Sequence, residues 1–307
     1  MIVESVSSSH PHVRRISGAA LLADLLFLYG FAIICGVIIP RFTGTHFRGF
    51  WCNDDSIKYI YKGDTVTTVE LFVYVFAVMM LPIVATEVYR ARLHGRSSFP
   101  QFKLGNVNIH PTTVPIVTYF GYSQLGFVAV FVITETTKNC IGRLRPHFLD
   151  VCKPININCT VNEYYSNYTC SGNADMVAEA RKSFFSGHSA FSMYASTFTA
   201  IYLLARLPRY SLRRVALPVC QIAVICTGLL ISYSRINDNK HHWSDVMVGI
   251  FVGTMIAIYT CLVWAQMLTK SSEESISINQ VRRVGEDEGA NYSASTSNMY
   301  ESPPEEK

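Results

Sequence analysis

Charged residues are scarce in this sequence. Of its 307 residues, only 16% are charged and 50% are hydrophobic, whereas soluble domains carry about 25% charged residues. The net charge of +4 is spread along the chain, and no basic and aromatic pattern indicates nucleic-acid binding. Clusters of Asp and Glu and the H-E-x-x-H motif are also lacking, so we expect no metal ion and no other cofactor.

The sequence contains several long apolar runs. A membrane-spanning helix needs roughly 20 mostly apolar residues, and continuous runs of this length exclude the short strands of a membrane barrel. We therefore predict an all-α polytopic membrane protein with six transmembrane helices. The fourth run is rich in Ser and Thr, which favours contact with other helices over contact with lipid. The runs are 17–39, 67–88, 113–134, 189–205, 215–233 and 246–268.

The predicted membrane domain spans 17–268, with a polar tail on each side. We expect 1–16 to be a cytoplasmic N-terminal segment and 269–307 to be a disordered cytoplasmic tail, because the latter has no apolar periodicity. Basic residues gather in the connections near 90–103 and 206–214. With six helices these connections share a side with both termini, and the positive-inside rule makes that side cytoplasmic.

The opposite side carries signs of an extracellular or lumenal space. The sequons at Asn158 and Asn167 predict glycosylation there, whereas the sequon at Asn291 lies in the cytoplasmic tail and should remain bare. Four cysteines fall in the predicted outer loops and are candidates for disulfides, but the sequence leaves their pairing open. They are Cys52, Cys152, Cys159 and Cys170.

Three polar segments stand at helix ends on this outer side. They are KNCIGRLRP (Lys138–Pro146), FSGH (Phe185–His188) and SRINDNKHHWSD (Ser234–Asp245). Taken singly, each fits an ordinary helix cap or basic side chains reaching the interface. Together they supply three cations, Lys138, Arg145 and Arg235, and a Ser186-Gly187 turn whose N–H groups precede a helix. This combination is typical of a phosphate site.

Two histidines and an aspartate add the means for group transfer. His188 and His241 have ordinary pKa values near neutrality. Asp245 follows His241 by four residues, so a helix here would place both on one face and let the carboxylate fix the imidazole tautomer. His242 would then point away from Asp245. We expect the remaining nearby polar residues to contact the surface or lipid headgroups: Arg143, Arg181, Lys182, Lys240 and His242.

The motifs K-x(6)-R-P, S-G-H and S-R-x(5)-H-x(3)-D, in this order, resemble the signature of the lipid phosphate phosphatases. These enzymes are membrane members of the type 2 phosphatidic acid phosphatase superfamily. The stretches RGFWCNDDSIKYIYKGDTVT (48–67), GRLRPHFLDVC and KHHWSDV resemble the animal branch, the phospholipid phosphatases. The resemblance covers roughly 17–268.

The resemblance implies a role for each matching residue. Lys138, Arg145, Ser186, Gly187 and Arg235 would bind the phosphate. His241 would be the nucleophile, Asp245 would orient it, and His188 would protonate the leaving alkoxide. The implied substrates are lipid phosphate monoesters: phosphatidate, lysophosphatidate, sphingosine 1-phosphate and ceramide 1-phosphate. A plasma-membrane location with an extracellular or lumenal active site follows from the same resemblance.

Two alternatives stay open at this level. A non-catalytic membrane protein could bind lipid phosphates or act in adhesion with the same fold, although the complete His188, His241 and Asp245 set favours an enzyme. An enzyme acting on polyprenyl or lipid diphosphates could use the same residues. The sequence is also compatible with a homo-oligomer and does not define the oligomeric state.

Overall fold

The computed structural model describes residues 14–94, 102–155, 157, 163–207 and 213–269. The chain divides into two compact units, Met1–Ala265 and Gln266–Lys307, and only 266–269 of the second are described. The predictions for most of the N-terminal segment and for the C-terminal tail therefore lie outside the described residues.

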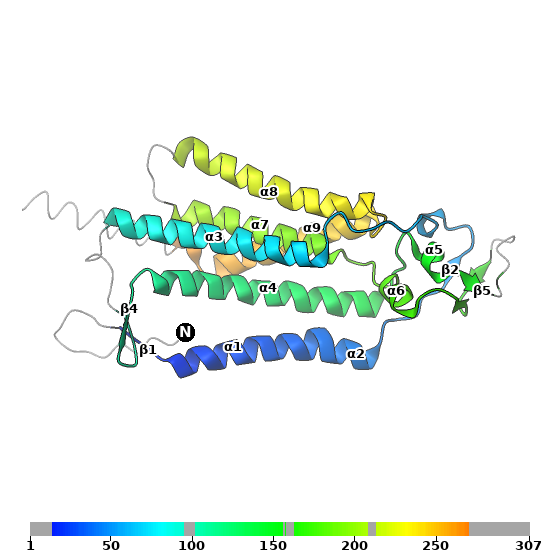
Figure 1. The fold of residues 1–307 in the computed structure, drawn as a ribbon, viewed down its shortest axis with the longest axis horizontal. Helices are drawn as coiled ribbons and strands as arrows, with labels where there is room; N and C mark the ends of the chain where they lie inside the picture. Colours follow the sequence, from blue (N-terminus) through cyan, green and yellow to red (C-terminus); the bar gives the residue numbers. More distant parts are fainter. Residues whose placement is uncertain (1–13, 95–101, 156, 158–162, 208–212, 270–307) are drawn as a thin grey trace, which may run out of the picture. The chain divides into compact units, whose positions relative to one another are not determined.

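Helices dominate the first unit (Figure 1). The first apolar run forms α1 (Gly18–Ile33), the π-helical turn Ile34–Ile38 and α2 (Ile39–Thr43). The other long helices are α3 (Thr68–His94), α4 (Thr113–Ile141), α7 (Gly187–Arg206), α8 (Arg213–Asn237) and α9 (Trp243–Tyr259), which continues as a π-helical turn over Thr260–Trp264.

Five of the predicted spans are confirmed by length and hydropathy within the described residues. They are Gly18–Thr43, Thr68–Leu93, Thr113–Ile141, Arg214–Asn237 and Trp243–Trp264. The fourth predicted run lies in α7, which is not among these five. The protein is therefore an all-α, multi-pass membrane protein, and a sixth span remains a prediction.

The polarity of α7 is explained by its position at the centre of the bundle. It packs against α3, α4, α8 and α9, and most of its residues are buried. Its hydroxyl groups bind neighbouring helices: Ser196 Oγ lies 2.8 Å from Tyr74 Oη, and Thr199 Oγ1 donates to Val78 O at 2.9 Å. In α9, a Cβ at Gly253 would lie 2.1 Å from Ala190 O, so only glycine permits this close approach of α9 to α7.

The two ends of the bundle differ (Figure 1). At one end a small sheet joins β1 (Arg14–Ile16), β3 (Phe102–Leu104) and β4 (Val107–Ile109), with β1 parallel to β3 and β3 antiparallel to β4. The opposite end carries the short elements η2 (Asp55–Ile57), α5 (Phe148–Cys152) and α6 (Ala174–Glu179). It also carries two antiparallel strand pairs, β2 (Phe50–Trp51) with β6 (Tyr164–Tyr165) and β5 (Pro154–Ile155) with β7 (Thr169–Cys170).

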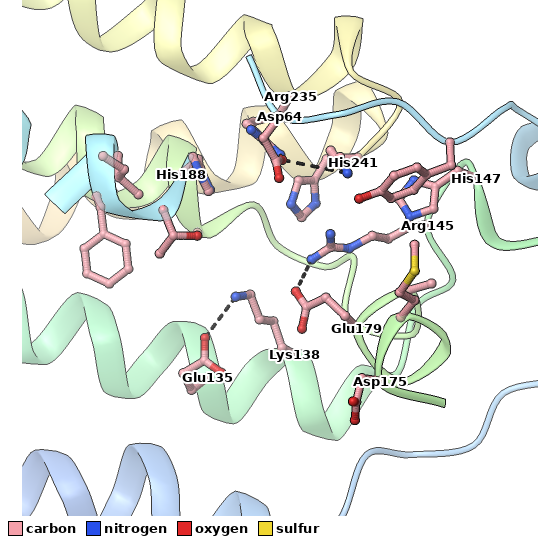
Figure 2. Close-up of a pocket in the computed structure, with 18 of the residues that line it drawn as sticks. Asp64, Glu135, Lys138, Arg145, His147, Asp175, Glu179, His188, Arg235 and His241 are labelled. Atoms are coloured by element: carbon pink, nitrogen blue, oxygen red, sulfur yellow. Dashed lines mark hydrogen bonds and ion pairs between the residues drawn. The ribbon is translucent and has the colours of Figure 1, made fainter. Parts of the chain in front are cut away.

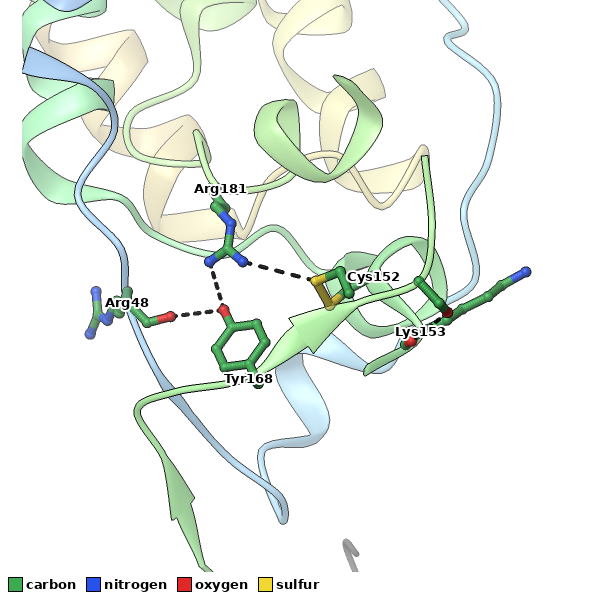
Figure 3. The surroundings of a disulfide bond; sticks show 7 residues. Arg48, Cys152, Lys153, Tyr168 and Arg181 are labelled. Atoms are coloured by element: carbon green, nitrogen blue, oxygen red, sulfur yellow. Dashed lines mark hydrogen bonds between the residues drawn. A yellow bond between two sulfur atoms is a disulfide. The ribbon is translucent and has the colours of Figure 1, made fainter. Parts of the chain in front are cut away.

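These short elements form a cap with its own small core. Phe50, Phe148 and Tyr168 pack together there, and Cys152 is disulfide-bonded to Cys170 beside them (Figure 3). Cys52 is disulfide-bonded as well, whereas Cys159 lies outside the described residues. Three of the four candidate cysteines, Cys52, Cys152 and Cys170, are thus in disulfides in the structure.

Arg181 belongs to this cap core, so the prediction that it contacts the surface or headgroups is wrong. Its guanidinium lies 4.3 Å from the centroid of the Phe47 ring and 5.1 Å from that of Phe148. It also donates to Tyr168 Oη at 2.6 Å (Figure 3). The side chain therefore holds three aromatic rings together by cation–π contacts and a hydrogen bond.

Candidate active site

A cavity of about 480 Å³ lies where the cap meets the helix ends. Six of the predicted site residues line it, and they come from α4, α7, the end of α8 and two loops (Figure 2). The structure therefore brings together segments that lie about 50 residues apart in the sequence, from 138 to 188 and from 188 to 241. The six residues are Lys138, Arg145, Gly187, His188, Arg235 and His241.

Local chain geometry points the first motif into the cavity. Lys138 lies in the last turn of α4, which ends at Gly142 with a left-handed φ of 60°. A Cβ at position 142 would meet His46 O at 2.0 Å, so glycine is needed both for the turn and for the contact. The following loop is fixed by hydrogen bonds from Arg145 N to Ala180 O and from Ser183 N to Arg143 O.

Each of the three predicted phosphate-binding cations has a carboxylate partner. Lys138 Nζ lies 2.9 Å from Glu135 Oε1, Arg145 pairs with Glu179, and Arg235 pairs with Asp64 (Figure 2). Burial favours the neutral form of Asp64, but the hydrogen bond and charge of Arg235 and the charge of Lys240 outweigh it, so the pKa of Asp64 is lowered. The carboxylates thus compensate the charges of the three cations.

Two donors in this cluster remain unsatisfied. Arg145 and Arg235 are both buried, and among the described residues the Nε atom of each has no hydrogen-bond partner. A buried guanidinium N–H without an acceptor is costly. Both side chains line the cavity, so an oxyanion bound there would meet two guanidinium groups, as expected for a phosphate site.

The Ser186-Gly187 turn begins α7. Ser186 is fully buried and does not line the cavity; its Oγ accepts from Ser189 Oγ at 2.9 Å, and its N–H donates to Asp245 O at 3.1 Å. Ser186 is the N-cap of α7, and its predicted contact with the phosphate stays a prediction. Gly187 does line the cavity, and a Cβ there would lie 3.4 Å from Lys138 Nζ.

His241 lies in the turn before α9 and is 4% exposed. Its Nδ1 lies 2.7 Å from Ser183 O. A carbonyl oxygen can only accept, so Nδ1 carries the proton and Nε2 keeps its lone pair. Burial, reinforced by the charges of Arg145, Lys138 and Arg235, lowers the pKa of His241 well below its ordinary value. The imidazole is therefore neutral at pH 7 and able to act as a nucleophile.

The predicted pairing of Asp245 with His241 is wrong in its geometry. α9 begins at Trp243, so His241 precedes the helix and the four-residue spacing does not place it above Asp245. The Asp245 carboxylate lies 3.9 Å from His241 Nδ1. It instead closes a capping box with His242: His242 N donates to Asp245 Oδ2 at 3.1 Å, and His242 Nδ1 lies 3.1 Å from the same oxygen.

Ser183 links Asp245 to His241 by two hydrogen bonds. Ser183 Oγ donates to Asp245 Oδ2 at 2.6 Å, while the carbonyl of Ser183 accepts from His241. Arg143 Nη1 lies 2.5 Å from Asp245 Oδ1. The predictions of surface or headgroup contact are therefore wrong for Arg143 and His242. They are wrong for Lys240 too, which is 3% exposed with its Nζ 3.8 Å from the centroid of the Tyr61 ring.

Several cavity residues were missed by the sequence analysis. Glu135 and Glu179 follow no motif, and their pairing with Lys138 and Arg145 depends on tertiary packing. His147 follows the R-P pair directly, which was an available signal. Its Nδ1 lies 2.7 Å from Asn239 O, and burial lowers its pKa to about 4. Among the described residues, no group of three or more His, Cys, Asp and Glu is arranged to hold a metal ion.

Comparison with known proteins places this geometry in a family. The PAP2 superfamily model matches residues 118–270, which include every cavity residue predicted from the sequence. The chain is 45% identical over 243 residues to phospholipid phosphatase homolog 1.2 homolog of Caenorhabditis elegans, covering 78% of this chain and 71% of that protein. The chain belongs to the phospholipid phosphatase family of the PAP2 superfamily.

Mammalian relatives agree with this assignment. Phospholipid phosphatase 1 of Mus musculus is 40% identical over 220 residues, with 70% of this chain and 74% of the relative covered. Phospholipid phosphatase 2 of Homo sapiens is 37% identical over 245 residues, with 78% and 81% covered. No solved structure matches the chain. The protein is thus a lipid phosphatase, a phosphoric monoester hydrolase of the membrane.

Proposed function

We propose that this phosphatase hydrolyses lipid phosphate monoesters without a metal ion, through a phosphohistidine formed on His241. The observation that carries the proposal is a neutral His241, with its Nε2 unprotonated, in a cavity that is also lined by the buried side chains of Arg145 and Arg235. In a cavity of this kind, fixed cations stabilise the charge of the transferring phosphoryl group, the work that metal ions perform in other phosphatases.

In the first half-reaction, His241 Nε2 attacks phosphorus. An N–P bond forms as the bond between phosphorus and the lipid oxygen breaks. His188 in its protonated form gives a proton to the leaving oxygen, which yields the lipid alcohol. In the second half-reaction, a water molecule gives a proton to His188 and attacks phosphorus, releasing inorganic phosphate and neutral His241.

The lining of the cavity supports a lipid substrate. Leu71, Phe72, Phe131 and Phe191 line it together with the cations. They lie within α3, α4 and α7, so an acyl or sphingoid chain could extend between these helices while the phosphate meets the cations. The proposed substrates all combine an apolar chain with a phosphate monoester. They are phosphatidate, lysophosphatidate, sphingosine 1-phosphate and ceramide 1-phosphate.

Release of inorganic phosphate from these four lipids, by purified protein in detergent micelles with excess EDTA, tests the proposal. We expect turnover that EDTA does not reduce and that vanadate inhibits, because vanadate resembles the phosphoryl transition state. Loss of activity in EDTA with recovery in Mg²⁺ would contradict the metal-independent mechanism. Binding of the lipids without phosphate release would favour the non-catalytic alternative, and faster release from diphosphates would favour the diphosphate phosphatase.

The cavity should face the extracellular or lumenal space, in the plasma membrane, with both termini in the cytoplasm. The disulfide Cys152–Cys170 lies at the cavity end of the bundle. The end of α3 with Arg90 and Arg92, and β3 with Lys103, lie at the other end. Disulfides form in oxidising compartments and basic loops stay in the cytosol, so both features support this orientation.

Asn167 provides a test of sidedness. It is exposed in the turn between β6 and β7, whereas Asn158 lies outside the described residues. In an Asn158→Gln background, glycosidase should increase gel mobility, and Asn167→Gln should remove that shift. Asn291→Gln, which removes the sequon of the predicted cytoplasmic tail, is the matched control and should leave the shift intact. A glycan on Asn291 would instead invert the proposed topology.

A further inference from the structure

We propose that the strap, residues 60–66 of the first outer loop, positions the general acid His188 relative to the phosphate-binding Arg235, and that Thr65 is its positioning residue. The inference rests on the proposed function, because it assigns an additional residue to the same reaction. None of the three signature motifs includes the strap, which precedes α3 in the sequence.

One backbone carbonyl of the strap contacts both functional side chains. His188 Nε2 lies 3.1 Å from Val66 O, and Arg235 Nη1 donates to the same oxygen at 3.0 Å. Two residues earlier, Asp64 pairs with Arg235 Nη2 and lies 3.8 Å from Lys240 Nζ. The position of Val66 O therefore determines where the imidazole and the guanidinium lie relative to one another.

The contact also determines which nitrogen of His188 exchanges protons. Because a carbonyl can only accept, Nε2 of His188 must carry its proton, and Nδ1 is left to exchange a proton with the leaving group and with water. A backbone carbonyl also orients His241, but through the other ring nitrogen. Ser183 O accepts a hydrogen bond from His241 Nδ1, which leaves Nε2 free to attack phosphorus. Both catalytic imidazoles are thus oriented by backbone carbonyls from other segments.

Thr65 attaches the strap to the third motif. Its Oγ1 donates to Asp238 Oδ1 at 2.6 Å and its N–H donates to Asp238 Oδ2 at 2.8 Å. Asp238 is 5% exposed and follows α8 directly, three residues after Arg235. Two further contacts join the same segments: Asn239 Nδ2 donates to Ile60 O at 3.0 Å, and Lys62 Nζ donates to Asn237 O at 2.9 Å.

These contacts fix the strap against the residues that follow Arg235. Removing the Thr65 hydroxyl would take away one charge-assisted hydrogen bond next to Val66, without touching His188, Arg235 or the substrate. A hydrogen bond to a charged group is worth enough to change a rate about tenfold. The loss should appear most clearly in the step that needs proton donation from His188.

The test compares Thr65→Val with wild type on two substrates in micelles. Lysophosphatidate has an alkoxide leaving group that needs protonation, whereas p-nitrophenyl phosphate has a good leaving group that needs little. We expect kcat for lysophosphatidate to fall about tenfold, and kcat for p-nitrophenyl phosphate to fall about twofold or less. Thr65→Ser, which keeps the hydroxyl, should restore both values.

Thr67→Val is the matched control. Thr67 lies two residues further on, and its hydroxyl bonds Glu70 at the start of α3 rather than any site residue. This variant should leave the ratio of the two kcat values unchanged, even if the melting temperature falls. An equal loss on both substrates in Thr65→Val, or no loss at all, would overturn the proposal. If the proposed function is wrong, wild type itself will not release phosphate from lysophosphatidate. If only this inference is wrong, wild type will be active and Thr65→Val will not show the selective loss.

Discussion

His241→Ala should reduce turnover of every lipid phosphate by at least about 10⁴-fold, because removal of a nucleophile leaves no route through the covalent intermediate. Binding should largely survive, since Lys138, Arg145 and Arg235 reach the cavity from other segments. The measurement is steady-state phosphate release, together with the inhibition constant of inorganic phosphate. Retention of substantial turnover would remove His241 from the nucleophile role.

His188→Ala is the comparison variant for this prediction. It should slow both half-reactions, but the loss should be smaller for p-nitrophenyl phosphate than for lysophosphatidate, because nitrophenolate leaves without protonation. His241→Ala should show no such dependence on the leaving group. An identical loss on both substrates in His188→Ala would contradict its role as general acid.

Asp245→Asn should lower kcat roughly 10–100-fold, the factor that corresponds to losing a hydrogen bond to a charged group. The fully buried carboxylate accepts from Ser183 Oγ and lies 2.5 Å from Arg143 Nη1. The neutral amide would leave Arg143 without its counter-charge and would loosen Ser183, whose carbonyl holds His241. Melting temperature should fall too, because breaking a buried ion pair leaves one charge uncompensated.

Ser183→Ala and His242→Ala distinguish the two hydrogen-bonding partners of Asp245. If Asp245 acts through Ser183, then Ser183→Ala should lower kcat clearly, with only a small fall in the free energy of unfolding. His242 is the N-cap of α9, so His242→Ala should cost about 1 kcal/mol of stability with a small change in kcat. A larger kcat loss in His242→Ala than in Ser183→Ala would show that the capping box, and not Ser183, transmits the effect.

The sequence predicted the spans well because an apolar run carries its own signal. The sequence also predicted that α7 contacts other helices, because Ser and Thr within an apolar run need hydrogen-bond partners in the bundle. Order and spacing identified the three site segments, and the structure brings Lys138, Arg145, Arg235 and both histidines to one cavity.

The geometry around His241 was not predictable from spacing alone. Whether α9 begins before or after His241 decides which histidine meets Asp245, and the capping box of His242 sets that boundary. The roles of Ser183 and Val66 depend on main-chain carbonyls, which any residue supplies and no motif marks. Likewise, the pairing of Arg235 with Asp64 joins residues 171 apart in the sequence.

Mapping the phosphoenzyme tests the central claim most directly. Wild-type enzyme mixed with labelled lysophosphatidate and quenched within one turnover should contain acid-labile, base-stable phosphate, and mass spectrometry of the peptide should place it on His241. The His241→Ala variant should yield no labelled protein under the same conditions. Phosphate mapped to His188 or His242, or full turnover without any trapped phosphohistidine, would contradict the account.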